Sequence, residues 1–162
     1  MSDPTALQRA ILGAEFLYTP RPDPVPGDLR MSWGIAMLIL ALFNSRGKKS
    51  NFQKLQFLAH AVRIEEGREE VRGLLSGKYR PVEVSVRVEP YLNRAVSFAH
   101  ALGLVKIERG VSISLTATGV DVAHELEKAS DLLEEERRFL REVAPKMTDE
   151  LMKRVWRLED LI

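Results

Sequence analysis

Residues 104–119, LVKIERGVSISLTATG, contain two short runs in which apolar and polar residues alternate, a pattern typical of half-buried strands. Gly110 lies between the runs and supplies the positive φ angle that a tight hairpin turn requires. Thr118 and Asp121 then fit the capping pattern with which helices begin. The stretch therefore predicts a β-hairpin followed directly by a helix. The expected apolar faces of the two strands consist of Val105 with Ile107, and Val111 with Ile113 and Leu115.

A helix is predicted immediately before the hairpin, over residues 90–103 (PYLNRAVSFAHALG). Pro90 suits the first turn of this helix, and Gly103 suits its C-terminal end. The order of helix, glycine stop, hairpin and capped helix is that of a winged helix-turn-helix. The predicted fold is therefore mainly helical with a small β-hairpin, built on a winged helix-turn-helix core. The inward side of the 90–103 helix is expected to carry Leu92, Ala95, Val96, Ala99 and Leu102, and its outward side Asn93, Arg94, Ser97 and His100.

Four further segments precede this helix. Residues 29–44 are apolar nearly all round, which predicts a central helix covered on several sides. Ser50 or Asn51 is expected to cap the next helix, and a shorter helix is expected over 65–76. Residues 82–88 alternate valine with polar residues, which predicts an extended segment or a short strand.

The chain ends extend this core. Residues 1–28 are expected to form a helical arm followed by a connector, since four prolines in 20–26 exclude a regular element. The winged-helix core is predicted to span 29–129. Residues 130–162 are predicted to form a C-terminal helical extension, in which Thr148 caps the last helix.

Composition limits the classes of function. The 162 residues include no cysteine, which excludes disulfides and thiolate nucleophiles, and the net charge is only +1. The three histidines lie outside any metal-binding pattern, and no glycine-rich phosphate loop is present. Neither an enzyme nor a bound cofactor is therefore expected. The N-terminus lacks a signal-peptide pattern and no apolar window spans a bilayer, so the expected location is the cytoplasm, away from membranes.

Basic residues are concentrated before residue 110. If they shared one face, they could neutralise nucleic-acid phosphates, although a solvated mixed-charge surface is the slightly favoured alternative. The hairpin turn is nearly neutral, because Glu108 lies between Lys106 and Arg109, and this composition favours a structural or protein contact over DNA. The candidate nucleic-acid-binding residues are Arg46, Lys48, Lys49, Lys54 and Arg94.

The last predicted helix is a candidate protein interface. Its apolar residues step by four, three and four positions, the spacing of a helix that packs on one partner helix, and a second apolar pair lies beside them. Docking on the chain's own body and docking on another protein remain open, with methionine and tryptophan favouring the interface. The candidate interface residues are Leu151, Met152, Val155, Trp156, Leu158 and Ile162.

Several stretches together resemble one prokaryotic family. The segments VRVEPYLNRAVSFAHALGLVKI and ISLTATGVDVAHEL, together with NFQKLQFLAHAVR and AILGAEFL, are similar in order to the middle components of ABC-type three-component systems. Glu89 departs from the aspartate expected before the proline, but either carboxylate can interact with the N-terminus of the following helix.

This resemblance implies a winged-helix adaptor encoded beside an ABC-family ATPase, in systems thought to serve anti-phage or genome-conflict defence. The implied partners are the ATPase, an effector subunit and further copies of the chain, with DNA reached through the assembly. The alternative function is that of a winged-helix DNA-binding transcription regulator.

Overall fold

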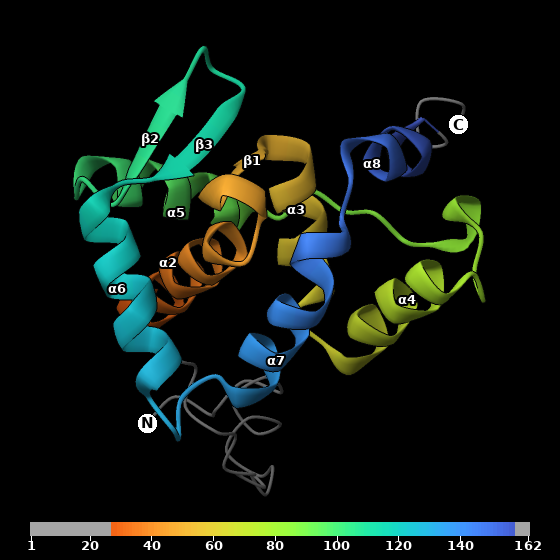
Figure 1. Ribbon diagram of the computed structural model, residues 1–162, viewed down its shortest axis with the longest axis horizontal. Coiled ribbons are helices and arrows are strands. Elements are labelled where there is room, and N and C mark those ends of the chain that lie inside the picture. Colours follow the sequence, from red (N-terminus) through yellow and green to blue (C-terminus); the bar gives the residue numbers. More distant parts are fainter. Residues whose placement is uncertain (1–26, 158–162) are drawn as a thin grey trace, which may run out of the picture.

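The computed structural model describes residues 27–157, which form a mainly helical body with one small antiparallel sheet (Figure 1). This part of the fold prediction is confirmed, whereas the arm helix predicted near 5–17 lies outside the described residues. The elements are α2 (Gly27–Phe43), η1 (Arg46–Lys48), β1 (Lys49–Asn51), α3 (Phe52–Ala61), α4 (Glu65–Ser76), η2 (Pro81–Glu83), α5 (Pro90–Ala101), β2 (Val105–Glu108), β3 (Ser112–Leu115), α6 (Ala117–Lys128), α7 (Glu134–Val143), η3 (Ala144–Lys146) and α8 (Asp149–Trp156).

The sheet has the strand order β1-β3-β2 with antiparallel pairing throughout. Strands β2 and β3 form the predicted hairpin, and Gly110 has a φ angle of 66° at its turn. The third strand, β1, pairs Ser50 with Ile113 and was not predicted, because its three residues include no apolar side chain. A strand this short is specified by its partner strand more than by its own sequence.

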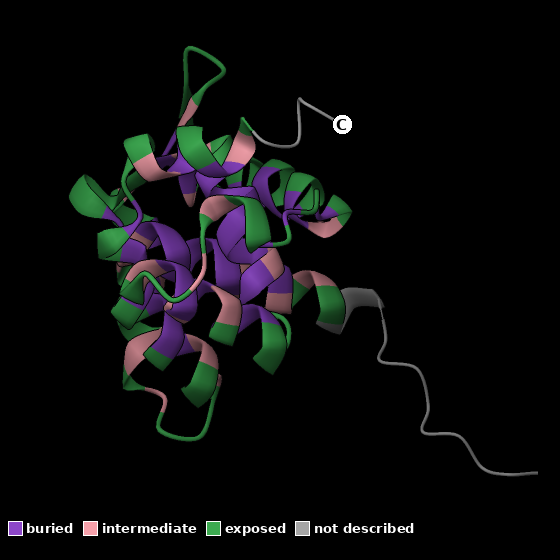
Figure 2. Cartoon of the chain, turned by 90° about the vertical axis from the view of Figure 1, so that its right-hand side faces the viewer, coloured by how far each residue is buried: buried purple, intermediate pink, exposed green. Residues whose placement is uncertain are grey.

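The expected apolar face of the hairpin is only partly buried. Val105 and Ile113 are fully enclosed, whereas Ile107 and Val111 are exposed. Figure 2 shows that the turn of the hairpin stands clear of the buried interior. Ile107 pairs with Ile113, so its exposure reflects the edge position of β2, whereas β3 lies at the centre of the sheet.

Two boundaries differ from the predictions. Helix α6 is capped by Thr116, two residues before the predicted Thr118, and the Thr116 side chain accepts a hydrogen bond from the Gly119 backbone. Residues 82–88 form no strand, because η2 takes their first residues and the rest run as an irregular connector to α5. Of its valines, Val84 and Val86 are buried and the other two are exposed.

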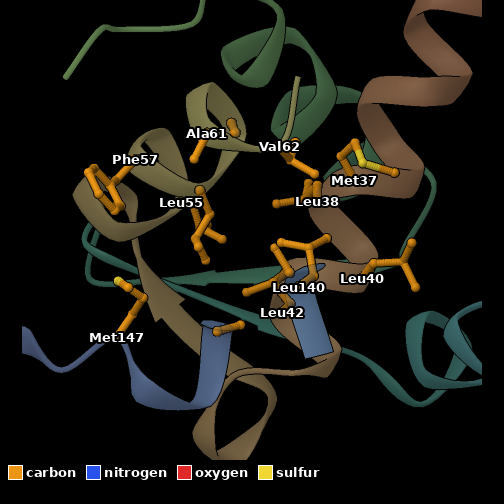
Figure 3. Close-up of a cluster of buried hydrophobic side chains, with 14 of the residues drawn as sticks. Met37, Leu38, Leu40, Leu42, Leu55, Phe57, Ala61, Val62, Leu140 and Met147 are labelled. Carbon is orange, nitrogen blue, oxygen red and sulfur yellow. The ribbon is translucent and has the colours of Figure 1, made fainter. Parts of the chain in front are cut away.

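Helix α2 occupies the centre of the body, as its apolar sequence predicts. It contacts α3, α5, α6 and α7, and every residue from Met37 to Leu42 is buried. Figure 3 shows side chains of α2 lying close to Leu55 of α3 and Leu140 of α7, and Met147 belongs to the same buried cluster. Burial on several sides explains why this helix lacks a polar stripe.

The described part of the C-terminal extension belongs to this same core. Phe139, Leu140 and Val143 of α7 are essentially inaccessible to solvent, and α7 packs against α2 and α4. Helix α8 packs against α3 and η2 (Figure 1). No helix within residues 27–157 is long and apolar enough to cross a membrane.

Candidate functional site

Helix α5 is fixed to α3 by the side chain of Gln56. The Gln56 Oε1 atom accepts a hydrogen bond of 2.7 Å from the Glu89 backbone N–H, just before α5 begins. Its Nε2 atom donates a hydrogen bond of 3.0 Å to Oδ1 of Asn93, in the first turn of α5. Gln56 is almost completely buried, so both hydrogen bonds satisfy groups that water reaches poorly. These bonds set the position of the α5 N-terminus.

The carboxylate of Glu89 adds a second attachment to α3. Its Oε1 atom lies 2.8 Å from Nδ1 of His60, and its Oε2 atom accepts a 2.8 Å hydrogen bond from Arg63. The Tyr91 hydroxyl donates to the backbone oxygen of Ala59 at 2.9 Å. Burial, together with the nearby Glu89 charge, raises the pKa of Tyr91 above its usual range. Helix α5 is therefore rigidly presented by the body.

The outward face of α5 is more apolar than the sequence predicted. Phe98 and Leu102 lie one turn apart and are 53% and 62% exposed. Leu102 was expected to face inward, but it is the residue that ends α5, where the helix leaves the core. The helix contains one permanently charged residue, Arg94. Exposed large apolar side chains on a fixed helix favour contact with a protein.

The hairpin, like α5, carries little net charge. Ile107 and Val111 are exposed there, and Lys106 and Arg109 flank Glu108. Strand β3 has the sequence SISL, without a charge. The hairpin therefore offers a phosphate backbone few cations.

The five candidate nucleic-acid-binding residues lie in different surroundings. Arg46, Lys49 and Lys54 line a common cavity. The Lys48 ammonium instead lies 5.4 Å from the centre of the Phe43 ring, and Arg94 is on α5. Lys54 is nearly buried, although it was predicted as a surface cation. The structure thus brings three of the five residues together, and nucleic-acid binding by the set stays a prediction.

Most of the candidate interface residues that are described on the last helix are buried or partly buried. Met152 and Val155 are buried within the chain's own body, and Leu151 and Trp156 pack partly against the same core. Burial of Met152 and Val155 favours the docking of α8 on the chain's own body, the other alternative that the sequence left open. Leu158 and Ile162 lie outside the described residues.

Phe98 is the exposed residue that sequence reasoning missed, because it was not counted on either side of α5. Its position relative to the buried Ala95 and Ala99 could have indicated an outward direction. Within residues 27–157 no group of three or more histidine, aspartate and glutamate side chains is placed to hold a metal ion. The chain matches no protein-family model, no curated protein and no solved structure.

Proposed function

We propose that this chain is a non-catalytic winged-helix adaptor, the middle component of a complex with an ABC-family ATPase and an effector subunit. The order of elements supports the winged-helix core, since α2, β1 and α3 precede α5 and the β2–β3 hairpin follows α5 directly. The pairing of β1 with β3 is the arrangement expected for such a domain with one wing. Helix α4 is then an insertion between α3 and α5.

The observation that carries the adaptor role is the apolar outward face of α5. In a winged-helix DNA reader, the helix before the wing enters the major groove and presents polar side chains to base edges. Here that helix exposes Phe98 and Leu102, which have no hydrogen-bonding group for a base. A protein partner that covers these two side chains removes apolar area from water.

The adaptor works by assembly. The attachments through Gln56 and Glu89 hold α5 in place before a partner arrives, so little order has to be imposed on binding. The ATPase contacts the α5 face, further copies of the chain complete the complex, and DNA is reached by the assembly as a whole. Such systems serve anti-phage or genome-conflict defence in the prokaryotic cytoplasm.

The test is co-purification with the ABC-family ATPase encoded beside this chain's gene. We expect a stable complex that Phe98→Asp together with Leu102→Asp abolishes, because two carboxylates would be desolvated on docking. The matched control is Ser130→Asp, which adds a carboxylate at an exposed position in the connection between α6 and α7. Unchanged complex formation by the double variant would refute this role for α5.

The alternative, a DNA-binding regulator, is favoured by one observation, the exposed cations Arg46, Lys48 and Lys49 in the turn after α2. Fluorescence anisotropy with duplex DNA at physiological salt separates the two functions. The adaptor is expected to bind no tighter than roughly micromolar, the non-specific range. Nanomolar, sequence-dependent binding that is lost in the Lys48→Glu/Lys49→Glu variant would overturn the adaptor proposal.

A further inference from the structure

A cavity of about 530 Å³ lies between β1 and the start of α8. Four separate parts of the chain form it: the η1–β1 segment, the first turn of α3, the beginning of β3, and the segment from η3 into α8. Asn51 and Asp149 join two of these parts, because the Asn51 Nδ2 atom donates a 3.2 Å hydrogen bond to Oδ1 of Asp149. The cavity is thus a product of the folded body and of no single sequence segment.

The cavity is electropositive. Arg46, Lys49 and Lys54 line it, against the single carboxylate of Asp149. None of the three cations forms a salt bridge with a residue in 27–157. Burial lowers the pKa of Lys54, the Asp149 carboxylate opposes that shift, and Arg46 adds to it. The folded chain therefore holds positive charge here without full compensation.

Ser50 provides an independent indication of a ligand. This residue lines the cavity and is 7% exposed, and its Oγ atom has no hydrogen-bond partner within the described part of the chain. A buried hydroxyl without a partner is costly, and native structures usually satisfy it. An anionic oxygen in the cavity would accept its hydrogen bond.

The cavity also has an apolar side, formed by Val111, Pro145 and Met147. Its volume falls within the range of about 300–1,000 Å³ that is typical of small-molecule sites. Inorganic phosphate alone would leave most of this space unfilled. A divalent cation is disfavoured because the three basic side chains outnumber the one carboxylate.

We propose that this cavity binds a small phosphorylated molecule. Its phosphoryl group contacts Lys54, Lys49 and Arg46 and accepts a hydrogen bond from Ser50, since guanidinium and ammonium groups are the usual partners of phosphate oxygens. Its organic part lies against Val111, Pro145 and Met147. Asp149 repels the phosphoryl group and so limits affinity. This site is separate from α5 and does not depend on the proposed partner.

Isothermal titration calorimetry of the full chain tests the site with three probes: AMP, adenosine and inorganic phosphate. AMP is expected to bind, adenosine is expected not to bind, and inorganic phosphate is expected to bind more weakly than AMP. Lys54→Met keeps most of the buried aliphatic volume and should weaken AMP binding by about tenfold or more, as loss of one charge-assisted hydrogen bond predicts. Asp149→Asn should tighten AMP binding, because it removes a repulsive charge.

The matched control is Lys78→Met, an exposed lysine outside the cavity, which should leave AMP binding unchanged. Thermal stabilisation of the unmodified chain by AMP gives a readout that requires no variant. The proposal is overturned if neither AMP nor phosphate produces binding heat or stabilisation. It is equally overturned if Lys54→Met binds AMP as the unmodified chain does, or if adenosine binds as well as AMP.

Discussion

Gln56 shows how a single side chain connects two helices that are far apart in the sequence. The similar stretches contain Gln56, Glu89 and Asn93, which are far apart in sequence. In the structure Gln56 hydrogen-bonds both to the backbone of Glu89 and to the side chain of Asn93. These three positions therefore form one connection between α3 and α5 in this chain. A connection of this kind stabilises the fold but does not determine the function. The partner and the activity have to be inferred from the exposed surface.

Tyr91 gives a prediction for stability at alkaline pH. Its folded-state pKa is raised, whereas in the unfolded chain it titrates near its usual value of about 10. Above that pH the unfolded state binds fewer protons than the folded state, so stability falls as pH rises. Between pH 9 and 11 we expect the unmodified chain to lose about 1 kcal/mol more than Tyr91→Phe. The midpoints of urea denaturation measure this difference when the dependence of the unfolding free energy on urea is the same for both proteins. Equal losses of stability in the two proteins would contradict the prediction.

At the scale of elements, the start of α6 distinguishes two threonines. Thr116 accepts a hydrogen bond from the Gly119 N–H, and its hydroxyl donates to the Gly103 backbone oxygen at 2.6 Å. Thr118, which the sequence pattern favoured, lies two residues further on in the first turn of α6 and is exposed. We expect Thr116→Ala to lower the free energy of unfolding by about 1 kcal/mol and Thr118→Ala by under about 0.5 kcal/mol. Chemical denaturation of both variants checks this, and the reverse order would place the cap at Thr118.

The elements that the sequence predicted are those with a local physical cause. Helix α2 follows from its nearly continuous apolar sequence, and α5 from its apolar periodicity and its proline and glycine ends. The α3 cap follows from Asn51, whose side chain accepts a hydrogen bond from the Lys54 backbone. Strand β1 could not be predicted, because its pairing with β3 is a tertiary contact. The valines of 82–88 alternate as a strand would, but within residues 27–157 no strand pairs with them.

At the scale of the whole molecule, the candidate sites also depend on tertiary contacts that no local sequence pattern predicts. The sequence identified Arg46, Lys49 and Lys54 as basic, but it could not show that they surround a cavity. That cavity is completed by Asp149, which is 98 positions from its hydrogen-bond partner Asn51. The apolar face of α5 was missed for a related reason. Leu102 is exposed because the end of α5 extends beyond the elements that cover the rest of the helix. The local sequence pattern contains no information about which part of a helix its neighbours cover.

The docking of α8 decides whether the last helix belongs to the body or to an interface. Met152 is 1% exposed, so Met152→Ala should cost about 2–5 kcal/mol by leaving a cavity between α8 and the elements that it contacts. Lys153→Ala, at the exposed neighbouring position, is the matched control and should change stability by under about 0.5 kcal/mol. If α8 docks on its own chain, Met152→Ala should leave any dependence of the unfolding midpoint on protein concentration unchanged, whichever other face joins copies of the chain. Thermal denaturation over a hundredfold range of protein concentration measures this dependence. A midpoint that rises with concentration in the unmodified chain, but no longer rises in Met152→Ala, would instead place α8 against another copy of the chain.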